Sequence, residues 1–329
     1  ITGASIEITP EMQGQYLAVN IEGTGDYKGI LKRGSERIGL NSQTVNAPVT
    51  QVEISSWAEL AAIPTGDAST GVEYILTNDL NSSSTGYNDH ASLLANGGDG
   101  WVPLGTASSP FKGSFNGNGY TISDLKINSS GIDYIGLFGV VAGEGVFEDV
   151  TFDSFNVTES GAEDGAFLIG LVTDNATVSI SSILITNSTL DGGGDLGSFV
   201  GDNVGALTIT NSTSSNIITS NSDNIGGFVG FNSGTITITR GINFSSVDGN
   251  DEVAGFVGDS FGVLIISHSI NYGSISGEDR TSGFVGKTSS DGNLIITNST
   301  NNGIISGSED EVGGFIAQIE NSENIVTLS

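Results

Sequence analysis

A phenylalanine in a glycine-rich setting returns every 28 to 32 residues through most of this chain of 329 residues. Several copies read Gly-Phe-Val-Gly, as at residues 227–230 and 255–258. A fixed period of this length is typical of chains built from stacked units, each of which buries its apolar face against its neighbours. The sequence therefore predicts a solenoid with a buried internal stack of aromatic rings. The seven stack positions are Phe138, Phe167, Phe199, Phe228, Phe256, Phe284 and Phe315.

Each repeat is expected to be one coil of a right-handed parallel β-helix. A unit of about 28–30 residues contains three short alternating segments, such as 235–239, separated by Gly, Asn, Ser and Asp. Alternation over about five residues between such breaks indicates strands. Strands of successive coils would pair in parallel, and crossovers between parallel strands are right-handed by default. The predicted fold class is therefore all-β.

Proline usage divides the chain. All five prolines lie within the first 110 residues. A stacked coil needs every strand N–H as a ladder donor, which proline lacks. We therefore expect regular β-helix repeats over 111–329, a cap with the first irregular coils over 51–110, and a β-rich extension over 1–50. A short helix at 56–62 would cover the first coil, with Ser56 as its N-cap and Glu59 completing a capping box.

Charge excludes several classes of partner. The chain has 38 acidic and 9 basic residues, for a formal net charge of -29. Such a surface repels nucleic acid and anionic lipid, and no apolar run is long enough to cross a bilayer. The chain does not begin with Met, which fits a removed leader and export. Four of the basic residues, Lys28, Lys32, Arg33 and Arg37, lie in the near-neutral extension, where they could dock onto an acidic neighbour.

The region that follows the extension resembles a known family. It contains Trp57-Ala58-Glu59-Leu60, then Trp101-Val102-Pro103-Leu104-Gly105, and then the segment 111–122 with its Phe-Asn-Gly-Asn-Gly-Tyr core. Gly136-Leu137-Phe138-Gly139 follows. In this order the motifs resemble the entry region of extracellular GLUG-motif repeat proteins, which are adhesin-like. The resemblance implies a β-helix and a surface location, and it carries no catalytic residues to transfer.

One predicted column of carboxylates is the strongest candidate for a metal site. An aspartate lies five positions before the repeat phenylalanine in five coils: Asp133, Asp223, Asp251, Asp279 and Asp310. Glu163 and Asp195 lie one residue later in two irregular coils, and Glu252 thickens the column. Stacked carboxylates about 5 Å apart repel by roughly 1–3 kcal/mol per pair unless they are screened or share cations. Oxygen-only ligands suit Ca²⁺, whereas turn capping by Asp and a saline habitat are the alternatives. No cofactor is required by this interpretation.

A second set of residues concerns asparagine. Asn211, Arg240, His268 and Asn298 form a predicted corner column, with Asn187 one coil earlier, and hydrogen bonds between coils are the expected role. Eight Asn-x-Ser/Thr sequons are candidates for glycosylation. They are Asn81, Asn128, Asn156, Asn175, Asn187, Asn211, Asn243 and Asn298.

Three functions remain open from the sequence. The first is a non-catalytic extracellular structural protein that assembles with itself, head to tail, into a filament, sheath or surface layer. This interpretation expects an uncovered last coil. The second is an adhesin or glycan-binding segment of a larger surface protein. The third is a carbohydrate-active enzyme, but His90 and His268 are the only histidines and no acid pair stands out, so no catalytic residue is predicted.

Overall fold

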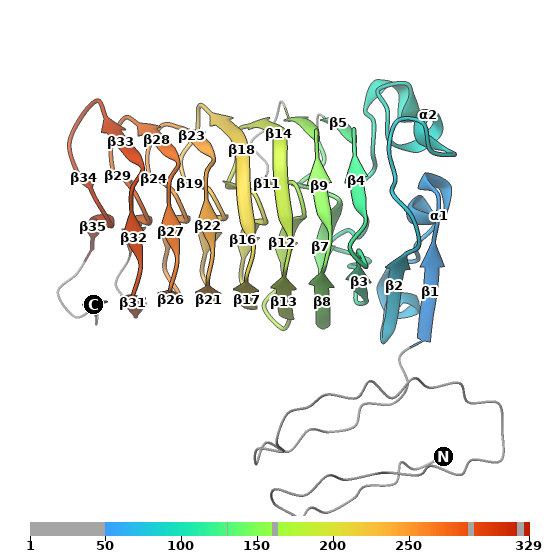
Figure 1. Cartoon of the computed structure of the whole chain (residues 1–329), viewed down its shortest axis with the longest axis horizontal. Coiled ribbons are helices and arrows are strands. Elements are labelled where there is room, and N and C mark those ends of the chain that lie inside the picture. The colour runs from blue at the N-terminus through green and yellow to red at the C-terminus, as the bar shows by residue number, and fades with distance from the viewer. Residues whose placement is uncertain (1–49, 130, 160–163, 289–292, 321–325) are drawn as a thin grey trace, which may run out of the picture. The chain divides into compact units, whose positions relative to one another are not determined.

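The chain forms a β-solenoid, described here from a computed structural model (Figure 1). The structure describes residues 50–129, 131–159, 164–288, 293–320 and 326–329. Residues 1–49 form a separate unit, so the predicted docking residues Lys28, Lys32, Arg33 and Arg37 lie outside the described part. In Figure 1 successive coils lie side by side along the long axis, and every strand pair of the ladders is parallel. The predicted all-β fold class is confirmed.

Four sheets run along the solenoid. Sheet 1 consists of β1 (Thr50–Ile54), β2 (Val72–Leu76), β3 (Ser114–Asn116), β8 (Glu144–Glu148), β13 (Thr177–Ser181), β17 (Ala206–Thr210), β21 (Thr235–Thr239), β26 (Val263–Ser267), β31 (Leu294–Thr297) and β36 (Val326–Leu328). Sheet 2 consists of β4 (Thr121–Ser123), β5 (Lys126–Ser129), β9 (Thr151–Asp153), β10 (Asn156–Glu159), β14 (Leu184–Gly192), β18 (Thr213–Ser220), β22 (Ile242–Asn243), β23 (Ser246–Asp248), β27 (Ile270–Asn271), β28 (Ser274–Gly277), β32 (Thr300–Asn301) and β33 (Ile304–Gly307).

Two narrower sheets complete each coil. Sheet 3 consists of β6 (Tyr134–Ile135), β11 (Asp164–Ala166), β15 (Leu196–Gly197), β19 (Ile225–Gly226), β24 (Val253–Ala254), β29 (Thr281–Ser282) and β34 (Val312–Gly313). Sheet 4 consists of β7 (Phe138–Val141), β12 (Ile169–Val172), β16 (Val200–Asn203), β20 (Val229–Asn232), β25 (Val257–Ser260), β30 (Val285–Thr288) and β35 (Ile316–Ile319). A coil therefore contributes to four sheets where the sequence predicts three strands, because the Gly-Phe-Val-Gly motif breaks one extended segment into two.

Short helices flank the first strands. They are α1 (Trp57–Ala61), the 3₁₀ turn η2 (Gly66–Ser69), α2 (Tyr87–His90) and the 3₁₀ turn η3 (Ala95–Gly98). Ser56 Oγ accepts a hydrogen bond from Glu59 N at 3.2 Å, as the sequence predicts. The Glu59 carboxylate bonds back to Ser55 N at 2.7 Å, one residue earlier than a standard capping box. Trp57 and Leu60 bury the helix against the core.

The aromatic stack is shorter than the sequence predicts. Phe199, Phe228, Phe256, Phe284 and Phe315 stack with consecutive ring centroids 4.6–4.9 Å apart. Strand register places Leu137 and Leu168, not Phe138 and Phe167, in the same column in the two earlier coils, because Phe138 pairs with Ile169 and Ile169 with Val200. Both phenylalanines are still fully buried. The core thus needs a large apolar side chain at this position, and leucine can replace phenylalanine.

Glycine, in contrast, is fixed by contact between successive coils. A Cβ at Gly255 would lie 2.4 Å from the carbonyl oxygen of Gly283 in the next coil and 2.7 Å from Asn271 Oδ1. A Cβ at Gly227 or at Gly283 would likewise lie 2.3–2.4 Å from a carbonyl oxygen of the next coil. At Gly314, which follows them in the series, a Cβ would meet no heavy atom of the chain within 4 Å. The parallel stacking of backbones therefore dictates these glycines, and not a need for positive φ.

Two asparagine ladders lie inside the solenoid. In sheet 4, Asn203 Nδ2 donates to Asn232 Oδ1 at 2.9 Å, and Asn232 donates onward to Ser260. A longer ladder joins the buried side chains of Asn243 and Asn271 at 2.8 Å, and Asn271 Nδ2 donates to Asn301 Oδ1 at 2.9 Å. Each amide donates a hydrogen bond to the next coil, which offsets much of the penalty for burying a polar group, although Oδ1 of Asn203 has no hydrogen-bond partner.

The expected corner column has a different cause. Asn211, Arg240, His268 and Asn298 all have φ between 49° and 56°, in the left-handed region. They follow sheet 1 strands directly, and their backbone N–H groups, not their side chains, bond to the next coil. Asparagine suits this conformation better than other non-glycine residues. Asn187 was wrongly assigned to this column, because the register of β13 and β17 places Ser182 there.

We expect Gly255→Ala to destabilise the solenoid by about 2 kcal/mol or more, because the backbone must shift to admit the methyl group. Gly314→Ala is the matched control and should leave stability within about 0.5 kcal/mol. Chemical denaturation followed by circular dichroism measures both changes. Equal midpoints for the two variants would contradict the proposed contact between coils.

Candidate functional site

The acidic column predicted from the sequence is a real alignment. The short strands of sheet 3 pair in register, and one aspartate precedes the first residue of each of β6, β19, β24, β29 and β34 by one or two chain positions. These are the predicted residues Asp133, Asp223, Asp251, Asp279 and Asp310. Asp195 belongs instead to the adjacent column, where its N–H bonds Asp164 Oδ1 at 3.2 Å. Glu163 lies outside the described residues.

Arg280 binds the middle of this column. Its guanidinium contacts Asp251 Oδ2 at 2.6 Å, Glu252 Oε1 at 2.6 Å and Asp279 Oδ2 at 3.2 Å. Asn250 Nδ2 donates to Asp223 Oδ1 at 3.0 Å, so a neutral amide supports the next carboxylate. These bonds relieve part of the repulsion that stacking would otherwise impose. Arg280 thus supplies positive charge that bound cations would otherwise supply, and Asn250 stabilises a further carboxylate by a hydrogen bond.

A second line of residues, three of the four charged, lies on the outer side of sheet 4, one position after the last glycine of each phenylalanine motif, such as Gly-Phe-Val-Gly. Strand register aligns Asp202, Phe231, Asp259 and Lys287. Lys287 Nζ lies 3.7 Å from Glu252 Oε1 and 3.8 Å from Asp259 Oδ2. Lys287 also contacts Glu320 at 3.2 Å, so one ammonium group serves three carboxylates. We call Asp195, Asp202, Asp223, Asp251, Glu252, Asp259, Asp279, Arg280 and Lys287 the charged cluster.

Burial perturbs several of these carboxyl groups. Burial raises the pKa of Asp202 to about 7, and the neighbouring Asp164 carboxylate adds to the shift. Burial also raises the pKa of Asp259 to about 7, against the opposing effect of Lys287. The pKa of Asp195 rises to about 6 for the same reason, although Asn224 donates it a hydrogen bond that opposes the shift. Oδ1 of Asp202 and Oδ1 of Asp259 have no hydrogen-bond partner.

Three carboxylates of the cluster could share a cation. One oxygen from each of Asp223, Asp251 and Glu252 lies within 4.8 Å of the other two. Arg280 already bonds two of these residues, so Ca²⁺ would have to compete with a fixed positive charge. Calcium binding by the predicted column therefore stays a prediction, and the test below is built on Arg280.

Sequence reasoning found the aspartate column but not the line after the glycine. No repeated residue type marks this line, because its members are Asp202, Phe231, Asp259 and Lys287, although each lies one position after the last glycine of its motif. That glycine also keeps the register in the two earlier coils, where Gly139 and Gly170 align with Gly201 while Phe138 and Phe167 do not align with Phe199. A glycine whose Cβ would clash with backbone atoms of the adjacent coil therefore marks the register better than the phenylalanine does.

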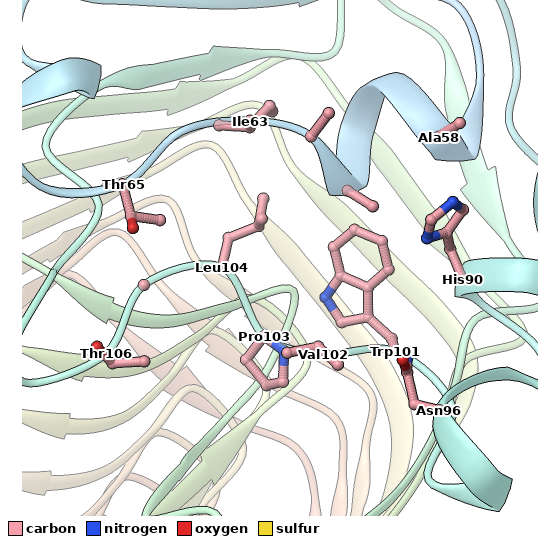
Figure 2. A pocket seen from close by; sticks show the side chains of 13 residues that line it. Ala58, Ile63, Thr65, His90, Asn96, Trp101, Val102, Pro103, Leu104 and Thr106 are labelled. Carbon is pink, nitrogen blue, oxygen red and sulfur yellow. The ribbon is translucent and has the colours of Figure 1, made fainter.

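A pocket of about 410 Å³ lies beside α1 (Figure 2). Trp101, Val102, Pro103 and Leu104 form one wall, and Ala58 and Ile63 lie opposite. His90 is the only ionisable residue among the thirteen that line it. Trp101 Nε1 is engaged, donating to Leu137 O at 3.0 Å. The lining contains no Asp or Glu, so this pocket does not offer the carboxyl pair that most glycoside hydrolases use.

The sequons differ in accessibility. Asn243 is fully buried in the asparagine ladder, so its side chain cannot receive a glycan in the folded chain. Asn81 is half-buried, and its Oδ1 accepts a hydrogen bond from Ser83 N. The other six are exposed: Asn128, Asn156, Asn175, Asn187, Asn211 and Asn298. Glycosylation at these six stays a prediction.

Asp202→Asn tests the buried carboxyl groups. A raised pKa means that the folded state holds its proton after the unfolded state has lost it, so this group lowers stability as pH rises from about 4 to about 7. We expect the variant to melt at least about 3 °C higher than the parent at pH 8, with a smaller gain at pH 4.5. Thermal melts across this range measure it. Exposed Asp133→Asn is the control, and an equal gain there would contradict the assignment.

Calcium is tested with and without Arg280. If the column binds Ca²⁺ with a Kd near 1 mM, 10 mM CaCl₂ adds about 1.4 kcal/mol of stability. Arg280→Gln frees oxygens of Asp251 and Glu252, so the calcium-induced rise in Tm should be larger in this variant. Melts in CaCl₂, in MgCl₂ of equal ionic strength and in chelator separate binding from screening. An identical response to both salts in both proteins would exclude the site.

Comparison with known proteins gives partial likenesses. No family model matches the chain. Halomucin of Haloquadratum walsbyi is 34% identical over 157 residues, which is 47% of this chain and 2% of halomucin. A candidate Gly-rich membrane protein of Evansella cellulosilytica is 38% identical over 87 residues, which is 26% of this chain and 10% of that protein. The chain thus spans only a small part of the length of either curated relative.

Among solved structures, a candidate immunoglobulin A1 protease from Bacteroides ovatus superposes with a TM-score of 0.57 at 16% identity. The match covers 88% of this chain and 87% of that one. At this identity the likeness concerns the fold alone. Within the residues that the structure describes, no helix has the length and apolar character needed to span a bilayer.

Proposed function

We propose that this chain is a non-catalytic structural component of an extracellular or cell-surface protein, and that copies associate into a layer, sheath or filament. The observation that carries the proposal is the segregation of charge around the solenoid. Acids gather where sheets 3 and 4 meet, in the charged cluster. Strands β17, β21, β26 and β31 of sheet 1 contain no charged residue, and neither do β18, β22 and β27 of sheet 2.

This arrangement suits a molecule that must stay dissolved yet pack laterally. A large net charge keeps copies apart unless their uncharged faces meet. The ladders and the buried core give a rigid body, with contacts that recur from coil to coil. The similarity to halomucin and to a candidate membrane protein supports a surface location, over the parts of the chain that match.

The enzyme alternative would rest on the charged cluster. A carboxyl group with a pKa near 7, such as Asp202, could act as a general acid. The cluster is also explained by stacking, because any acid placed in a sheet 4 column is buried beside its neighbours. A glycan-binding assay distinguishes the adhesin alternative from the structural role.

The proposal is tested on cells that make the protein. We expect antibody labelling viewed by electron microscopy to mark ordered fibres or a continuous layer outside the cell. The purified chain should show no turnover on a panel of neutral polysaccharides. Labelling confined to the cell interior would refute the surface role. Turnover that Asp202→Asn abolishes, without loss of folding, would establish the enzyme instead.

A further inference from the structure

Sheet 2 presents an exposed apolar band. Its members are Leu184, Ile217, Phe244, Tyr272 and Ile304, with exposed fractions of 38%, 51%, 50%, 46% and 73%. They come from five successive coils, in β14, β18, the segment between β22 and β23, the segment between β27 and β28, and β33. Five coils at about 4.8 Å per coil give a band about 19 Å long. The strand registers place its members in three adjacent columns: Leu184 in the first, Phe244 and Tyr272 in the second, and Ile217 and Ile304 in the third. Bands of this kind on a soluble surface mark contact sites more often than chance exposure.

The aromatic pair at the centre has a specific geometry. The rings of Phe244 and Tyr272 are stacked, with centroids 5.0 Å apart and planes only 6° from parallel. Their inner faces are turned toward each other. A sugar ring that stacks on an aromatic needs an open face, whereas aliphatic and aromatic side chains pack against ring edges readily. The pair therefore favours another apolar surface over a glycan.

The surroundings of the band exclude an acidic partner. The neighbouring side chains are Ser215, Ser246, Ser274 and Ile242 on the same face, according to the strand registers. Asp248 marks the edge of the band, one alternate position beyond Ser246. No arginine or lysine lies in β18, β22, β23, β27, β28, β32 or β33. An acidic ligand would thus find no counter-charge.

We propose that the band is the lateral interface between two copies of this chain, an inference that rests on the structural role proposed above. A partner has to present apolar side chains that recur at the spacing of the coils, and a second solenoid does so because its rise per coil is the same. Two copies of a chain with a net charge of -29 can approach only where acids are absent, and the band meets this condition. A two-fold contact would place Phe244 and Tyr272 of each copy at its centre.

The size of the band sets the expected affinity. Five half-exposed side chains offer roughly 400 Å² per copy. Stable interfaces bury about 800 Å² per partner. The association is therefore expected to be weak and reversible for a pair, and to strengthen when salt screens the repulsion between copies. Weak pairwise contacts suit a layer in which each copy has several neighbours.

The experiment is sedimentation velocity of the full chain across a range of concentrations, at low and high NaCl. The average mass should rise from the monomer value of 33.6 kDa toward twice that value, and more steeply in high salt. The double variant Phe244→Asp, Tyr272→Asp should weaken association at least tenfold. The control Thr237→Asp, Ile265→Asp adds the same charge to the outer side of sheet 1, and it should weaken association no more than about twofold. All four side chains are at least partly exposed, so melting temperatures should stay close to that of the parent.

Three outcomes would overturn the inference. If only the sheet 1 variant dissociates, copies associate through the other uncharged face, and the structural role survives. If the parent stays monomeric in high salt while cell-surface labelling is ordered, assembly uses other surfaces, and again only this interface fails. If the parent is monomeric and binds a neutral glycan on an array, with binding lost in the Phe244 and Tyr272 variant, then the band serves an adhesin.

Discussion

The structure depends on one constraint: successive coils stack in parallel and in register, about 4.8 Å apart. Every side chain then meets its equivalents directly above and below. At Gly255 the rule is absolute, because the carbonyl of Gly283 fills the place of a Cβ. At other positions the constraint favours residues whose side chains pack well against the same residue type in the adjacent coils. Rings stack, as Phe256 and Phe284 do at 4.6 Å, and amides pair, as Asn243 and Asn271 do.

Much of this could be predicted from the sequence, because the constraint leaves a period. The solenoid, the parallel pairing and the aspartate column all follow from recurrence at fixed spacing. Register was harder, since it depends on which residue of the motif cannot vary. Phe138 and Phe167 show that the large apolar residue can move by one position, with Leu137 and Leu168 taking its place. The backbone contact that fixes glycine is not visible in a sequence.

The candidate site was predicted less well than the fold. Its acids were found as a column, but Asp202, Asp259 and Lys287 were not, because the residue type changes from coil to coil along their line and leaves no repeated pattern. No repeated pattern in the sequence marks Arg280, and its contacts with Asp251 and Glu252 depend on the three-dimensional structure. The burial that raises the pKa of Asp202 and Asp259 comes from the meeting of sheets 3 and 4, which local pattern does not encode.

Charge segregation follows from the same stacking. An acid repeated in one column repels its neighbours, so it needs either solvent, as at Asp133 and Asp310, or a compensating residue such as Arg280. Compensation is local, and it leaves the net charge of the chain far from zero. A solenoid that carries its acids along one side must keep another side uncharged if copies are to meet at all. Stacking in register makes that side continuous from coil to coil, so exposed apolar residues of successive coils, as in the band from Leu184 to Ile304, gather in one patch on which two copies can pack.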